Sequence, residues 1–144
     1  MRFSQDLHLA AQQLQQRISD LPPEKTILAG FSQGAITVMD LMLNQPNYAG
    51  MMFWSGQVYN RSEWLERLST CAHQLPEIMM SHGEFDPVLP IFASKTWQND
   101  LAQHGVKVDY CQFAGEHEIP LVVIQKSRDY LERVTKLNLG AASQ

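Results

Sequence analysis

Apolar and polar residues follow two different periods along this chain, one typical of helices and the other of strands. Residues 6–21 place apolar side chains at steps of three and four, which predicts an amphipathic helix. Residues 26–29 and 77–81 predict strands, and the continuous apolar run at residues 49–54 is typical of a strand that is covered on both faces of a sheet. Residues 106–113 alternate between apolar and polar positions, which predicts a fourth strand, at an edge of the sheet.

Helical patterns lie between and after these predicted strands. Residues 35–43 predict a helix, and Ser62 can cap a short one. Pro90 suits the first position of a longer helix that ends at Gly105, and Pro120 opens a last helix. Four apolar residues of that last helix are expected to point inward: Leu121, Ile124, Leu131 and Val134. Strands that alternate with helices predict an α/β fold with a mostly parallel sheet of about four strands, flanked by helices.

Composition and charge narrow the classes of protein that this fold can serve. The 144 residues suit a single domain, and residues 1–144 contain no linker and no repeat. A net charge of −4 gives no basic surface for a nucleic acid, and the lack of a run of about 18 apolar residues argues against a transmembrane helix. The first residues lack the pattern of a signal peptide, and Cys71 and Cys111 lack metal-binding spacing. We therefore expect reduced thiols in a cytoplasmic protein.

A pentapeptide with the pattern of a nucleophile elbow lies between the first predicted strand and its helix. Residues 30–34 read Gly-Phe-Ser-Gln-Gly, and the G-x-S-x-G turn projects its central serine, here Ser32, away from the backbone. The glycines on either side are expected to let the strand and the helix approach closely. The backbone N–H of Gln33 is expected at the start of the helix, where it can stabilise a negatively charged oxygen. The stretch predicts a nucleophilic hydroxyl and one oxyanion donor.

A serine nucleophile needs a base, and the base needs a carboxylate that orients it. In α/β-hydrolases the chain order is Ser, then Asp or Glu, then His, which leaves His104 and His117 as bases. His104 suits the end of a helix, whereas His117 lies in a loop between a predicted strand and a predicted helix, so we favour His117. For the acid, Asp86 and Glu84 compete, and Asp109 is a distant third. Asp86 is favoured because Asp-Pro promotes a turn that can hold the carboxylate.

Other residues near the predicted strand ends divide into substrate contacts and structural residues. The loops that follow parallel strands meet at one edge of the sheet, which is where ligands bind in such folds. Four residues are expected to contact the substrate there: Ser55, Gly56, Val88 and Leu89. His82 is expected to make a local hydrogen bond in a structural turn, and His8 is expected to lie on the surface.

Three blocks of this sequence, taken together, are similar to the motifs of one family of enzymes. The blocks are Gly30–Gly34, His82–Pro90 and Gly115–Ile119, and the similarity extends over roughly residues 6–135. They resemble the carboxylesterase/phospholipase family, which includes the acyl-protein thioesterases. The resemblance implies an α/β-hydrolase fold. It also implies a serine hydrolase that cleaves carboxylic esters or thioesters of lipids or small molecules and needs no metal or cofactor.

Carried over residue by residue, the resemblance implies Ser32 as the nucleophile, Asp86 as the acid and His117 as the base. The chain departs from the family in two places. Ala35 stands where the family often has a second glycine. Family members also carry several strands before the first helix of this chain, and a glycine-containing loop that supplies a second oxyanion donor. Residues 1–144 therefore look like the C-terminal portion of the fold.

These departures change what the chain is expected to do. With Gln33 as its one oxyanion donor, the enzyme is expected to turn over about 100- to 1000-fold more slowly than one with two donors. The strand at residues 26–29 would become an open edge and one sheet face would lose helix cover, which favours a homo-oligomer through that edge or face. Two other functions stay open: an inactive hydrolase that serves as a binding or assembly module, and a peptidase on the same fold.

Overall fold

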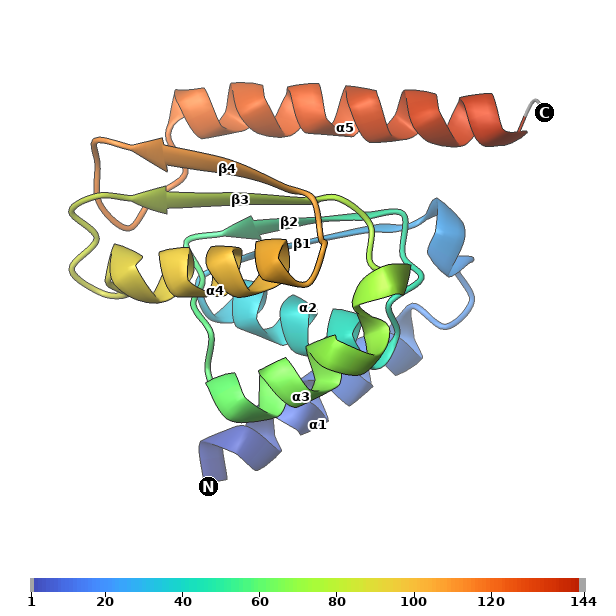
Figure 1. The fold of residues 1–144 in the computed structure, drawn as a ribbon, viewed down its shortest axis with the longest axis horizontal. Helices are drawn as coiled ribbons and strands as arrows, with labels where there is room; N and C mark the ends of the chain where they lie inside the picture. Colours follow the sequence, from blue (N-terminus) through green and yellow to red (C-terminus); the bar gives the residue numbers. More distant parts are fainter. Residues whose placement is uncertain (1, 143–144) are drawn as a thin grey trace.

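A four-stranded parallel sheet forms the centre of the computed structural model, which describes residues 2–142 (Figure 1). The strands lie side by side in chain order: β1 (Ile27–Phe31), β2 (Gly50–Trp54), β3 (Ile78–Gly83) and β4 (Val108–Phe113). Every neighbouring pair is parallel; Ile27, for example, lies opposite Gly50. The predicted parallel sheet of four strands is therefore confirmed, and so is the edge position of the last strand.

Four helices lie on one side of this sheet, with α1 packed on α2, and a fifth helix lies on the other side (Figure 1). In chain order, the helices described are α1 (Arg2–Arg17), α2 (Gln33–Asn44), α3 (Arg61–Cys71), α4 (Ile91–Gln103) and α5 (Leu121–Ala142). Two short 3-10 turns, Pro23–Lys25 and Ala72–Gln74, precede β1 and β3. The helices between consecutive strands all lie on the same side, as expected for crossovers between neighbouring parallel strands. α5 lies alone on the opposite side.

The hydrophobic core has two parts because side chains alternate between the faces of each strand. Met51 and Phe53 of β2 face the four helices, whereas Met52 faces α5. The larger part is completed by Trp64 of α3 and Trp97 of α4, both fully buried, with ring centroids 5.1 Å apart. Since the middle strands bury side chains on both faces, their sequences are continuous apolar runs and not alternating ones.

β1 is an open edge of the sheet, and at β1 the sheet face on the α5 side is only partly covered. Leu28 is buried against the four helices, while Ala29 and Phe31 point to the other side and are exposed. α5 packs over β3 and β4. The expected loss of helix cover on one face is thus limited to the part of that face next to β1.

The inward side of α5 differs from the prediction. Among residues 121–136, the part of this helix whose burial is described, four are buried: Val123, Ser127, Tyr130 and Val134. Leu121 and Ile124 are 67% and 54% exposed and Leu131 is also exposed, so the prediction was right for Val134 alone. The Tyr130 hydroxyl donates to the Glu77 carbonyl at 2.5 Å and accepts from the Met51 N–H at 2.8 Å. Because of these bonds, the side of α5 that faces the sheet includes polar residues, and the spacing of apolar residues alone does not reveal that side.

Some helix ends also differ from prediction. α1 ends at Arg17, which leaves Leu21 outside the helix and 50% exposed. α3 is capped by Asn60 and not by Ser62: the Asn60 side-chain oxygen accepts the Glu63 N–H at 3.3 Å. Gly105 follows α4 with φ +81, which confirms the predicted glycine stop. Within residues 2–142, no helix combines the length and the apolar character needed to cross a membrane.

Candidate active site

Ser32 lies at the apex of a sharp turn between β1 and α2. Its φ is 58°, a left-handed backbone conformation that costs a non-glycine residue on the order of 1–3 kcal/mol. The Ser32 N–H donates to the Trp54 carbonyl at 2.9 Å, and the Ala35 N–H donates to the Ser32 carbonyl at 3.0 Å, so the turn is held from both sides. The strained backbone supports the predicted nucleophile elbow.

The two glycines of the elbow are not equivalent. A Cβ at Gly30 would overlap the backbone carbonyl of Gly34, so the strand and the helix can approach this closely only without a side chain at position 30. A Cβ at Gly34 would meet no atom within 4 Å. The expectation that both glycines are needed for close approach is therefore correct for Gly30 and wrong for Gly34.

His117 and Asp86 complete a row of hydrogen bonds that begins at Ser32. The Ser32 Oγ lies 2.8 Å from His117 Nε2, and His117 Nδ1 lies 2.7 Å from Asp86 Oδ2. Because a carboxylate only accepts, His117 Nδ1 carries the proton of the neutral ring and Nε2 accepts from the serine hydroxyl. This order of groups is the one in which a serine hydroxyl loses its proton to histidine.

The Asp86 carboxylate is held by backbone donors from its own loop. Its Oδ1 accepts the N–H of Val88 at 2.8 Å and of Leu89 at 2.9 Å, and the side chain is buried. Burial alone would raise the pKa of Asp86, but the bonds from Leu89, His117 and Val88 outweigh it and hold that pKa below its ordinary value. The carboxylate is thus charged at neutral pH and fixed in direction.

The structure separates the predicted alternatives for acid and base. Glu84 is exposed and accepts a bond from Gln112, and Asp109 accepts one from Arg133. His104 lies at the end of α4, where its Nδ1 is 2.8 Å from the Asp100 carbonyl. None of the three contacts the Ser32–His117 pair in the contacts described, whereas Asp86 does.

Backbone bonds tie the acid loop to the base loop. The Glu84 N–H donates to the Phe113 carbonyl and the Phe85 N–H to the Gly115 carbonyl, both at 2.9 Å. A Cβ at Gly83 would overlap the carbonyls of Gly115 and Glu116, so a glycine is required where the two loops meet. The ring centroid of Phe31, next to Ser32, lies 4.9 Å from that of His117, and the two ring planes make an angle of 39°. Sequence reasoning missed this contact, although Phe31 stands inside the elbow.

The predicted substrate contacts divide into two pairs. Ser55 is fully buried, its N–H donates to the Ser81 carbonyl at 2.8 Å, and Gly56 packs against Phe53 and Ala35. Burial argues against the predicted substrate contact by Ser55 and Gly56, which support the elbow from within. In the second pair, Val88 is 60% exposed and Leu89 is partly exposed. Their role as pocket walls stays a prediction.

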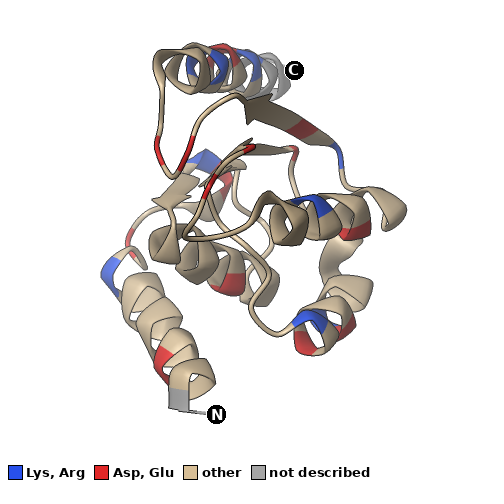
Figure 2. Cartoon of the chain, turned by 90° about the vertical axis from the view of Figure 1, so that its left-hand side faces the viewer, with Lys and Arg blue, Asp and Glu red and all other residues tan. Residues whose placement is uncertain are grey.

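The strands end on the side of the molecule that faces the viewer in Figure 2. Two loops on this side, residues 84–90 and 114–120, carry the acid and the base. Besides the buried Asp86 they contain three exposed carboxylates, Glu84, Glu116 and Glu118, and no lysine or arginine. A rim of negative charge of this kind around the site lowers the local concentration of anions and raises that of cations. We therefore expect the site to disfavour negatively charged substrates.

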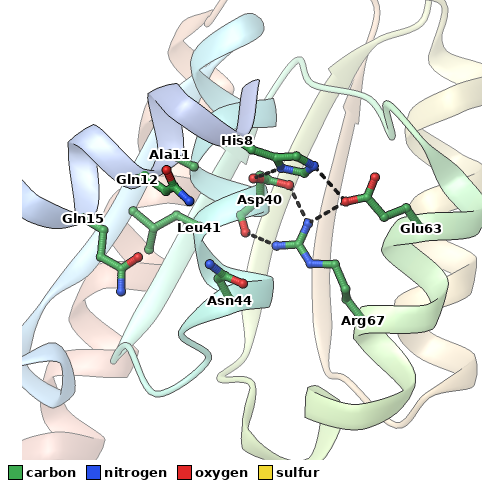
Figure 3. Close-up of a pocket in the computed structure, with 9 residues that line it drawn as sticks. All are labelled: His8, Ala11, Gln12, Gln15, Asp40, Leu41, Asn44, Glu63 and Arg67. Carbon is green, nitrogen blue, oxygen red and sulfur yellow. Dashed lines mark hydrogen bonds and ion pairs between the residues drawn. The ribbon is translucent and has the colours of Figure 1, made fainter. Parts of the chain in front are cut away.

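A second charged cluster joins α1, α2 and α3 (Figure 3). His8 is partly exposed, in line with the predicted surface position, but its Nδ1 lies 2.8 Å from Asp40 Oδ2 and its Nε2 lies 2.9 Å from Glu63 Oε1, contacts that the prediction missed. These three side chains are close enough together to hold a metal ion. However, Arg67 Nη1 already binds Asp40 at 2.6 Å and also contacts Glu63. A cation would meet this guanidinium, so the cluster suits an ion-pair clamp between helices.

Comparison with known proteins agrees with the fold. Residues 3–135 match the family described as Phospholipase/Carboxylesterase, and the chain therefore belongs to that family. It is 32% identical over 131 residues to acyl-protein thioesterase 1 of Kluyveromyces lactis, a match that covers 86% of this chain and 57% of that protein.

Solved structures confirm the α/β-hydrolase fold. The crystal structure of Zea mays acyl-protein thioesterase 2 matches with a TM-score of 0.79 and 17% identity, over 89% of this chain and 64% of that one. Esterase PE8 matches with a TM-score of 0.71 and 24% identity, over 89% of this chain and 58% of that one. The chain spans about half the length of the curated relatives it matches. What those whole proteins do comes to this chain as a proposal.

Proposed function

We propose that this chain hydrolyses carboxylic esters or thioesters through an acyl-serine intermediate. One observation carries the proposal: hydrogen bonds of 2.8 and 2.7 Å run from Ser32 through His117 to Asp86. A serine hydroxyl in water is a poor nucleophile, and this ordered pair of partners is the arrangement that activates it for attack on an electrophilic carbon. Membership of the carboxylesterase family makes an acyl carbon the expected target.

The proposed reaction has two halves that use the same histidine. His117 Nε2 takes the Ser32 proton as Oγ attacks the acyl carbon, and the Gln33 N–H stabilises the resulting oxyanion. The bond to the leaving alcohol or thiol breaks, and His117 protonates that group. A water molecule then attacks the acyl-serine and gives its proton to His117. Collapse of the second tetrahedral intermediate releases the acid and returns the proton to Ser32.

A weaker or inactive hydrolase is the alternative that one observation favours. The elbow contributes one expected oxyanion donor, the backbone N–H of Gln33 at the first position of α2. If the Gln33 N–H acts alone, turnover is expected to be about 100- to 1000-fold below that of a site with two donors. In the limit, the chain would serve as a binding or assembly module.

We also propose that a second copy of the chain pairs with β1. Backbone groups of Thr26 and Ser32 bond toward β2, so by alternation those of Ile27, Ala29 and Phe31 point outward. Two antiparallel copies centred on Ala29 would satisfy these groups and place Ile27 opposite Phe31 of the other copy. Light scattering tests this pairing, because a strict monomer at high concentration would contradict it.

We place the protein in the cytoplasm, since Cys71 and Cys111 are free thiols.

Hydrolysis of a small panel of esters tests the proposed reaction. The panel contains chromogenic esters and one thioester, with cationic, neutral and anionic members of equal acyl length. We expect hydrolysis by the wild type, slowest for the anionic member, and loss of it in Ser32→Ala and His117→Ala. Ser62→Ala, a change at an exposed serine, is the matched control and should keep wild-type rates. A folded wild type that cleaves nothing would favour the inactive alternative, and full activity in Ser32→Ala would overturn the proposal.

A further inference from the structure

His82 is a fully buried histidine at the end of β3, next to the candidate site. Its Nε2 lies 2.5 Å from the Leu89 carbonyl oxygen and 3.4 Å from Asp86 Oδ2. The proposed reaction uses His117 and gives His82 no part. A polar ring in the interior nevertheless carries a desolvation cost, which is offset only if its polar atoms find partners.

The surroundings of His82 fix which of its nitrogens carries the proton. A carbonyl oxygen only accepts, so Nε2 is the donor in its bond to Leu89. His82 Nδ1 is buried and has no partner among the residues described, so a second proton there would be a buried, unpaired charge. Burial accordingly lowers the pKa of His82. The ring is neutral with its proton on Nε2, the opposite of the neutral His117 ring, whose proton is on Nδ1.

Leu89 is hydrogen-bonded both to His82 and to the Asp86 carboxylate. The Leu89 carbonyl accepts from His82, while the Leu89 N–H donates to Asp86 Oδ1 at 2.9 Å. Most of the loop at residues 84–90 is exposed, and Asp86 is its one buried residue. Backbone bonds to the base loop hold the start of this loop at Glu84 and Phe85, but packing gives residues 87–90 little support. The bond from His82 at the end of β3 therefore fixes the position of Leu89.

We propose that His82 is a positioning residue for the triad, acting through Leu89 and Asp86. This inference rests on the proposed hydrolase function. His82 does not touch the substrate and does not exchange a proton in the reaction. Its Nε2–H anchors the loop so that the Val88 and Leu89 amides aim Asp86 at His117. Without the anchor, the carboxylate would drift, and a displacement of about 1 Å at a catalytic group can cost about 100-fold in rate.

Two substitutions of opposite chemistry test the anchor. His82→Phe keeps a buried planar ring but removes the donor, whereas His82→Gln keeps an N–H that can reach the Leu89 carbonyl. We expect kcat to fall about 100-fold in His82→Phe with KM unchanged, and Gln to restore most of the loss. His104→Gln, at the end of α4, is the matched control. A folded His82→Phe protein with wild-type kcat would overturn the proposal, and so would a Gln variant no better than Phe.

Nuclear magnetic resonance gives a readout that needs no activity. Long-range proton–nitrogen correlation spectra of the wild type should show His82 protonated on Nε2 and His117 on Nδ1. Hydrogen exchange of the Val88 and Leu89 amides should be faster in His82→Phe than in the wild type or His82→Gln. Protonation of His82 on Nδ1 alone would contradict the inference, even if His82→Phe fails to fold. If the wild type shows these signals but no hydrolysis, the proposed function fails while the anchor stands.

Discussion

Replacing Asp86 with asparagine is the change whose effect the geometry defines most sharply. The side-chain oxygen of the new asparagine must stay where Asp86 Oδ1 is, because the Val88 and Leu89 amides point at it from 2.8 and 2.9 Å. Turning the amide over would set its NH₂ group against two N–H donors and leave both unsatisfied. The NH₂ group therefore faces His117 Nδ1.

This orientation changes which nitrogen of the His117 ring carries the proton. Facing a donor, His117 Nδ1 must accept, so the neutral ring carries its proton on Nε2 and presents N–H to Ser32. The base can then no longer take the serine proton. In serine proteases the same substitution lowers kcat by about 10⁴, which corresponds to about 5.4 kcal/mol at about 1.36 kcal/mol per factor of ten.

Steady-state hydrolysis and circular dichroism measure the effect of Asp86→Asn. We expect a native spectrum, a kcat lower by about 10⁴ and a KM close to that of the wild type. Glu84→Gln removes a carboxylate from the same loop, at an exposed position, and is the matched control. The assignment of Asp86 would be refuted if Asp86→Asn kept activity within tenfold of wild type, or if Glu84→Gln lost as much.

Three further predictions concern stability. Gly30→Ala should lower the free energy of unfolding in urea by about 1–3 kcal/mol through overpacking, whereas Gly34→Ala, with open space around its new Cβ, should not; equal effects would contradict the elbow geometry. Asp40→Asn should lower the free energy of unfolding by about 3–5 kcal/mol because it leaves Arg67 without its buried carboxylate. Glu66→Gln, at an exposed position of α3, should leave that free energy unchanged. Similar unfolding curves for the two variants would contradict a stabilising role of the ion-pair clamp. The lowered pKa of His82 means that the unfolded chain binds a proton below about pH 6.5 that the folded one does not, so stability should fall as pH drops below that value. That fall should be smaller in His82→Gln, and an identical pH dependence would show that His82 does not contribute.

Much of the fold follows from the sequence because its two middle strands are buried on both faces. The apolar run at residues 49–54 has one interpretation, a covered strand, and the structure contains it as β2. α5 was harder, because Tyr130 and Ser127 reach the interior through hydrogen bonds to Glu77 and Trp54. Bonds to partners more than 50 residues away leave no periodic signal in the helix itself.

The candidate site was predictable in part, for a related reason. Ser32 and His117 stand out because each follows a strand at the same edge of the sheet. Asp86 and Glu84 are two residues apart in one loop, and only backbone direction, which aims two amides at Asp86, separates them. The contacts of His8 leave no signal in the sequence of α1, because its partner Asp40 lies in a different helix.

Labelling with a fluorophosphonate probe, with the modified residue located by mass spectrometry, tests the central claim most directly. The probe reacts with an activated serine and requires no knowledge of the natural ester. We expect one adduct, on Ser32, in the wild type, and none in Ser32→Ala or His117→Ala. No adduct on a folded wild-type chain, or an adduct that persists in His117→Ala, would contradict an assembled Ser32–His117–Asp86 triad.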